Sequence, residues 1–137
     1  MEELRPFVDI FMPSMPADPE ALFGTNNTNK IISESTARGI KIVVVKKGDL
    51  GSSIYHDGNT IDLDPYQREK VVDTTGAGDA FNGAFLHGIM NGMSHYEAAC
   101  LANISAGMNI TGRGALSGMA KGEVIYDLHK KYMEEMG

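Results

Sequence analysis

Short continuous apolar runs alternate with one-sided amphipathic segments in the first half of this chain, and their order predicts an α/β fold. Residues 7–12 and 40–45 are rich in apolar and β-branched residues. Such runs are typical of strands buried on both faces of a parallel sheet. Residues 30–38 between them have one apolar side and end at Gly39, which predicts a helix. A strand–helix–strand order implies a right-handed crossover.

A β-hairpin is predicted directly after the second strand. Asp57-Gly58 is a strong two-residue turn signal, and it separates residues 52–56 from residues 60–63. This hairpin would extend the sheet in the antiparallel direction.

The remaining chain predicts three helices. From Ala77 to Asn91-Gly92 apolar residues recur at helical spacing, and Ser94 with Glu97 forms a capping-box pattern that opens a second helix rich in small residues. The last helix is amphipathic. Its apolar side is expected to consist of Val124, Ile125, Leu128 and Tyr132.

Composition narrows the class of protein. The chain has 137 residues, which suits a single domain, and no apolar run approaches the ~20 residues that span a bilayer. A net charge of −6 argues against a nucleic-acid partner. The acidic start lacks a secretory signal, so a cytoplasmic location is expected. The single cysteine, Cys100, is interpreted as a small core residue rather than a nucleophile.

The glycine-rich turn at residues 73–79 carries the candidate chemistry. It joins the β-branched pair Val71-Val72 to the predicted helix, and Gly76 and Gly78 let backbone N–H groups approach a ligand. Together with the positive end of the helix dipole, this turn predicts a phosphate site. Asp79 would repel a phosphate, so its presence has two explanations: it accepts a proton from an attacking hydroxyl, or it is a first-turn acid that the dipole favours.

The stretch Asp73-Thr74-Thr75-Gly76-Ala77-Gly78-Asp79-Ala80-Phe81 resembles the C-terminal signature of the ribokinase-like (phosphofructokinase-B type) carbohydrate kinases. Residues 43–51, 102–107 and 111–115 resemble neighbouring family segments in the same order. The resemblance implies the C-terminal part of a ribokinase-like fold: a partly parallel sheet with a hairpin extension and packed helices. Residues 1–137 would form a single nucleotide-binding domain, without the family's N-terminal sugar-binding part and lid.

The resemblance also implies roles for individual residues. Asp79 would take the hydroxyl proton, while the N–H groups of the turn would stabilise charge on the transferring phosphoryl. The turn residues are Gly76, Ala77 and Gly78; the nucleotide-binding residues are Lys46, Gly48, Gly51 and Asn103; and the potassium-binding positions are Asp73, Thr75, Asn109 and Gly114. Lys46 can equally be a solvated strand end, and Asp73 can equally serve only to fix the turn.

One family motif is missing from the chain. The family's Asn-x-x-Glu motif, which organises magnesium, is replaced by Ser14-Met15-Pro16-Ala17. Asp18 or Glu20 could substitute after an insertion, or they could simply start a helix.

These observations predict ATP- and magnesium-dependent phosphoryl transfer to a carbohydrate hydroxyl, with an isolated chain that is incomplete. The alternative is a non-catalytic nucleotide-binding or assembly module. The expected partners are ATP and a sugar, together with the missing N-terminal half or a second copy docked on exposed apolar surface.

Overall fold

The computed structural model describes residues 7–66, 70–111 and 122–136. The chain forms two compact units, residues 1–64 and residues 65–137. None of the helices in the described ranges has the length and apolar character that crossing a membrane requires.

The first unit is built around a four-stranded mixed sheet in the order β1-β2-β3-β4. Strand β1 (Ile10–Phe11) runs parallel to β2 (Ile42–Lys46), with Ile10 opposite Ile42. Strands β3 (Ser52–His56) and β4 (Asn59–Leu63) continue the sheet in antiparallel fashion. The partly parallel sheet with a hairpin extension is therefore confirmed, although only two residues of the expected first strand are paired.

The hairpin forms because its two turn residues accept a left-handed backbone. Asp57 has φ 50° and Gly58 has φ 81°. Positive φ at both central residues defines the turn type that matches the twist of the flanking strands. The Asp57-Gly58 signal thus fixes the register of β3 against β4.

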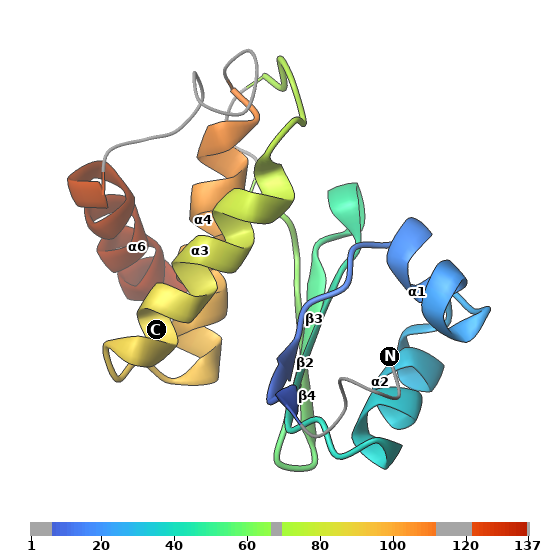
Figure 1. The fold of residues 1–137 in the computed structure, drawn as a ribbon. Coiled ribbons are helices and arrows are strands. Elements are labelled where there is room, and N and C mark those ends of the chain that lie inside the picture. Colours follow the sequence, from blue (N-terminus) through green and yellow to red (C-terminus); the bar gives the residue numbers. More distant parts are fainter. Residues whose placement is uncertain (1–6, 67–69, 112–121, 137) are drawn as a thin grey trace. The chain divides into compact units, whose positions relative to one another are not determined.

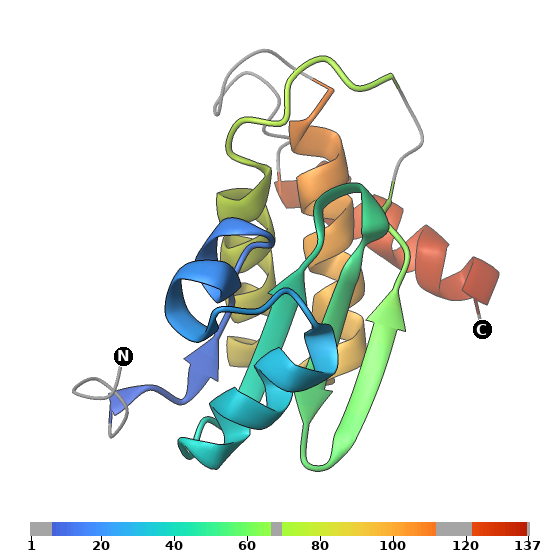
Figure 2. The same cartoon turned by 90° about the vertical axis from the view of Figure 1, so that its right-hand side faces the viewer.

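Helices α1 (Ala17–Phe23) and α2 (Thr28–Ala37) both lie on one face of this sheet (Figures 1 and 2). The apolar side of α2 packs against alternate residues of β2, as expected for a buried crossover helix. The core between them consists of Ile31, Ile32, Ile40, Val43 and Val45.

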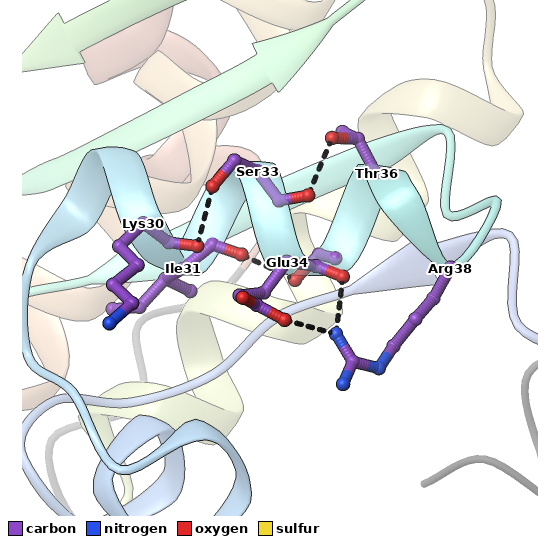
Figure 3. A network of polar contacts seen from close by, with 7 residues as sticks. Lys30, Ile31, Ser33, Glu34, Thr36 and Arg38 are labelled. Carbon is purple, nitrogen blue, oxygen red and sulfur yellow. Dashed lines mark hydrogen bonds and ion pairs between the residues drawn. The ribbon is translucent and has the colours of Figure 1, made fainter.

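Polar contacts hold the exposed side of α2 (Figure 3). At its start the Asn27 side chain accepts a hydrogen bond from the Lys30 N–H at 3.0 Å. At its end the Arg38 guanidinium donates to the Glu34 carboxylate at 2.7 Å, and it lies 5.1 Å from the centre of the Phe23 ring. Because Asn27 supplies the cap, the helix begins at Thr28, slightly earlier than its apolar spacing suggests.

Among its described residues the second unit contains the helices α3 (Ala77–Met90), α4 (His95–Asn109) and α6 (Gly122–Met136). The predicted end of α3 at Asn91 is confirmed, and so is the capping box: Glu97 N–H donates to Ser94 Oγ at 3.1 Å and Ser94 N–H donates to the Glu97 carboxylate at 2.8 Å. Helices α3 and α4 approach closely where Gly88 meets Ala98.

Contacts with other elements set two local features of this unit. The β-branched pair Val71-Val72 lies outside the strands, and the Val72 N–H donates to the carbonyl of Ile110 at 2.8 Å. On α6, Val124 is 44% exposed, whereas His129 is buried and donates through Nε2 to the Glu97 carbonyl at 3.0 Å. Ile125, Leu128 and Tyr132 are half-buried as expected, so the predicted apolar side holds except at Val124 and also includes His129.

Candidate functional site

The glycine turn opens α3 as predicted. Asp73 Oδ1 accepts the Thr75 N–H at 2.8 Å, which fixes the residues before the turn. Gly76 follows in a left-handed conformation (φ 81°) and is the N-cap, and Ala77 is the first helical residue. A helix start leaves its first N–H groups without intrahelical acceptors, and here the Ala77 N–H donates to the Thr74 carbonyl, before the helix, at 3.3 Å. A glycine turn at a helix start has the chemistry of an anion site.

Asp79 occupies the first turn of α3 and is exposed to solvent. Its side chain borders a pocket of about 360 Å³ whose walls are mostly apolar and come from α3, α4 and α6. An exposed carboxylate one turn from the anion-binding N–H groups can receive a proton from an incoming hydroxyl. The same position suits a first-turn acid that the helix dipole stabilises, so both explanations remain compatible with the geometry.

The predicted cation-binding positions converge at the C-terminal end of α4. Asn109 is fully buried there, and its Nδ2 donates to the Thr75 carbonyl at 2.8 Å. Among the residues that the structure describes, Asn109 Oδ1 is buried with no hydrogen-bond partner. The structure thus brings Asp73, Thr75 and Asn109 together, while Gly114 lies outside the described residues.

Asn103 lies on α4 and is buried, with 9% of its surface exposed. The preceding small residues Ala99 and Ala102 are also buried, whereas residues 105–107 are half-buried. A buried amide of this kind is kept only where it has polar partners.

The remaining nucleotide-side residues belong to the first unit. Lys46 ends β2, and Gly48 begins a short 3₁₀ turn, η2 (Gly48–Leu50). Gly51 has φ 83°, and a Cβ there would lie 1.9 Å from the Leu63 carbonyl oxygen. Gly51 is therefore required by packing against β4, whereas the space above Gly48 is open.

The acids near the missing Asn-x-x-Glu motif serve local structure. The Asp18 carboxylate accepts the Ser14 N–H at 2.8 Å, and the Glu20 carboxylate accepts the Asn26 amide at 2.9 Å. Within the described ranges, no group of three or more His, Cys, Asp or Glu residues could hold a metal ion. Asp18 and Glu20 both lie in the first turn of α1, which supports the interpretation that they start this helix.

Sequence reasoning missed one polar pair in the pocket that Asp79 borders. His87 Nε2 on α3 forms a hydrogen bond with the Tyr126 hydroxyl on α6, and the two rings are edge to face at 5.8 Å. The partners are 39 residues apart, so no local spacing connects them.

Cys100 is a core residue, as the sequence indicated. It is 1% exposed, and burial raises the pKa of its thiol above the ordinary value. A protonated, buried thiol is a poor nucleophile.

Comparison with known proteins places this site in a family. Residues 1–121 match the model of the pfkB family carbohydrate kinases, so the chain belongs to that family, and its fold is ribokinase-like. It is 37% identical over 119 residues to a ribokinase of Lactococcus lactis, covering 87% of this chain and 38% of that protein. It is also 37% identical over 100 residues to a 5-dehydro-2-deoxygluconokinase of Clostridium tetani, covering 72% of this chain and 29% of that protein.

Solved structures of ribokinases also resemble this chain. A ribokinase of Arabidopsis thaliana complexed with ribose and ATP superposes with a TM-score of 0.87 at 29% identity, over 95% of this chain and 43% of that one. A ribokinase II candidate of E. coli in complex with ATP and Mg²⁺ gives 0.83 at 28% identity, over 95% and 42%. The chain spans less than two fifths of the two curated relatives named above.

Proposed function

We propose that this chain supplies the ATP side of a sugar kinase that transfers the γ-phosphoryl group to a carbohydrate hydroxyl. The observation that carries the proposal is the left-handed glycine turn that opens α3 with Asp79 in its first turn. Family membership supports the reaction class, and a related ribokinase binds ribose and ATP. Residues 1–137 would act as one nucleotide-binding domain.

In this proposal each part of the turn has its own task. The N–H groups of Gly76, Ala77 and Gly78 stabilise the negative charge of the transferring phosphoryl, and Asp79 accepts the proton of the attacking hydroxyl. The other proposed nucleotide contacts come from Lys46, Gly48, Gly51 and Asn103.

Magnesium would arrive with the nucleotide. Among the described residues no group of three or more His, Cys, Asp or Glu could hold a metal ion, and Asp18 and Glu20 are engaged in local hydrogen bonds. Mg²⁺ commonly keeps several waters and binds chiefly through substrate phosphates, which is compatible with this donor set.

The C-terminal end of α4 offers a candidate site for a monovalent cation. Asp73, Thr75 and Asn109 are neighbours there, because the Asp73 carboxylate accepts the Thr75 N–H and Asn109 Nδ2 donates to the Thr75 carbonyl, and each of the three residues carries oxygen atoms. We propose that potassium binds there, with Gly114 as a further contributor, and that its charge stabilises the turn. The buried Asn109 oxygen without a hydrogen-bond partner among the described residues supports this assignment, because such an atom is costly unless a ligand satisfies it.

A second candidate function is nucleotide binding without transfer. It is favoured by the share of the relatives that the chain covers, 38% and 29% for the two curated relatives named above. Substrate positioning provides much of the rate of phosphoryl transfer, so residues 1–137 acting without a sugar-binding part would bind ATP and phosphorylate nothing. The sugar-binding part would then come from another segment or a second copy.

A transfer assay separates the two candidates. The chain is incubated with γ-labelled ATP, magnesium, potassium and a panel of pentoses, hexoses and sugar acids, and ATP binding is measured in parallel by calorimetry. Labelled sugar phosphate supports the kinase, and binding without transfer supports the second candidate. A folded chain that shows neither binding nor transfer would contradict both.

A further inference from the structure

Asn109 contacts a residue that is far from it in the sequence, so no local sequence pattern could predict the contact. Its side chain is fully buried at the C-terminal end of α4, and Nδ2 donates to the carbonyl of Thr75, 34 residues earlier, at 2.8 Å. This hydrogen bond joins α4 to the residue directly before the left-handed Gly76.

The same end of α4 holds the preceding segment through backbone contacts. The Ile110 carbonyl accepts the Val72 N–H at 2.8 Å and the Asp73 N–H at 3.2 Å. The approach to the glycine turn is thus fixed by two residues, and Asn109 provides the contact nearest to the turn.

The Thr75 carbonyl and the Gly76 N–H belong to one rigid, planar peptide group. In a trans peptide the two bonds point in opposite directions, so a partner that fixes the carbonyl also fixes the direction of the N–H. Asp73 Oδ1 fixes the preceding peptide group in the same way, by accepting the Thr75 N–H at 2.8 Å.

We propose that Asn109 is a positioning residue for the anion-binding turn: by holding the Thr75 carbonyl, it orients the Gly76 N–H toward the transferring phosphoryl. This inference rests on the proposed function of the turn. It assigns the task to the side-chain amide of Asn109, which is separate from any cation that its Oδ1 binds.

The test compares Asn109→Ala with Ser35→Ala, a control in the other unit. The Ser35 side chain is also fully buried and donates to a backbone carbonyl, that of Ile31, at 2.7 Å. Each variant removes a buried side-chain donor to a backbone carbonyl, but the Ser35 contact is local to α2 and the Asn109 contact spans 34 residues, so the larger loss of stability is expected in Asn109→Ala. In buffer with N-methylglucamine as the only monovalent cation, which removes any effect of a potassium ligand, only Asn109→Ala should weaken the Kd of ATP with magnesium, by roughly tenfold or about 1.4 kcal/mol. Only this variant should also shift the amide resonance of Gly76 in the ligand-free protein.

Equal ATP affinity in Asn109→Ala and in the wild type would overturn the inference while leaving the proposed function intact. A wild-type chain that binds no ATP would instead remove the proposed function, and the Gly76 amide resonance would still test the orienting contact. If Asn109→Ala does not fold, the inference is tested instead by a measurement on the wild-type protein. A scalar coupling across the hydrogen bond from Asn109 Nδ2 to the Thr75 carbonyl carbon is expected, and its absence in the folded protein would overturn the inference.

Discussion

The carbonyl oxygen of Tyr66 lies so close to Gly107 that a Cβ added to this glycine would stand 2.1 Å from it. Gly107 is inside α4, where glycine is an unfavourable helix former. Its presence is explained by the approach of the Tyr66 backbone, which leaves no room for a side chain. Because a backbone carbonyl cannot rotate away as a flexible side chain can, the contact should tolerate no larger residue.

Replacing Gly107 by Ala is therefore expected to destabilise the chain by about 1–3 kcal/mol, despite the gain in helix propensity. Gly83→Ala is the matched control, because Gly83 is inside α3 and nothing lies within 4 Å of its added Cβ. That variant should be stabilised by up to about 1 kcal/mol. Chemical denaturation of both variants provides the measurement, and equal effects would show that Tyr66 does not restrict position 107.

The capping box of α4 predicts a pH dependence of stability. Hydrogen bonds from the Ser94 backbone and side chain lower the pKa of the Glu97 carboxyl below its usual value. Because the folded-state pKa is the lower one, the stabilisation is fully present above the unfolded-state pKa and is lost as pH falls through the folded-state pKa. Glu97→Gln should therefore lose less stability than the wild type on acidification.

The variant Ser94→Ala separates the effect of Glu97 titration on stability from the effect of the Ser94 hydroxyl, which caps α4. The variant keeps the Ser94 backbone N–H that donates to Glu97 at 2.8 Å, so most of the pH dependence should remain. It loses the hydroxyl that accepts the Glu97 N–H, which should cost about 1 kcal/mol at neutral pH. Thermal midpoints of both variants between pH 3 and about 7 test the pair. Parallel curves for Glu97→Gln and the wild type would contradict the assignment.

Asp79→Asn tests the proton acceptor in a transfer-competent preparation, either the chain alone or the chain combined with the sugar-binding part of a relative. The variant keeps the size of the side chain and removes its basicity, so turnover should fall by ~10²–10⁴. ATP affinity should persist or rise slightly, because a negative charge near the γ-phosphate is removed. Asp127→Asn, on the exposed side of α6, is the charge control. Wild-type turnover in Asp79→Asn would identify Asp79 as only a helix-start residue.

Potassium dependence tests the proposed cation site at Asp73, Thr75 and Asn109, three residues that hydrogen bonds link to one another. ATP affinity should be higher in potassium than in N-methylglucamine at equal ionic strength, because the cation would stabilise the turn that binds phosphate. The selectivity should also weaken in Asp73→Asn. Identical affinities in potassium, sodium and the organic cation would assign these oxygens another role.

Much of the fold could be predicted because its signals are local. Asp57-Gly58 alone selects the hairpin turn, and Ser94 with Glu97 fixes the start of α4. Features set by distant contacts could not be predicted. The Val72 N–H pairs with the Ile110 carbonyl, and the buried His129 of α6 pairs with the Glu97 carbonyl; neither contact follows from local spacing.

The candidate site divides in the same way. The Asp73–Thr75 turn and the start of α3 follow from residues next to each other in sequence. The amide of Asn109 reaches Thr75 across 34 residues, and sequence reasoning expected only backbone carbonyls near that position. The single-domain organisation, the cytoplasmic location and the roles of the site residues stay predictions.

Titration of the isotope-labelled chain with ATP and magnesium tests the central claim most directly, because it locates the ligand as well as detecting it. Binding at the turn should shift the amide resonances of Gly76, Ala77 and Gly78 more than those of the exposed hairpin tip at Asp57 and Gly58. The shifts should saturate at millimolar nucleotide or below. A folded chain whose turn resonances do not move at saturating ATP and magnesium would contradict the account.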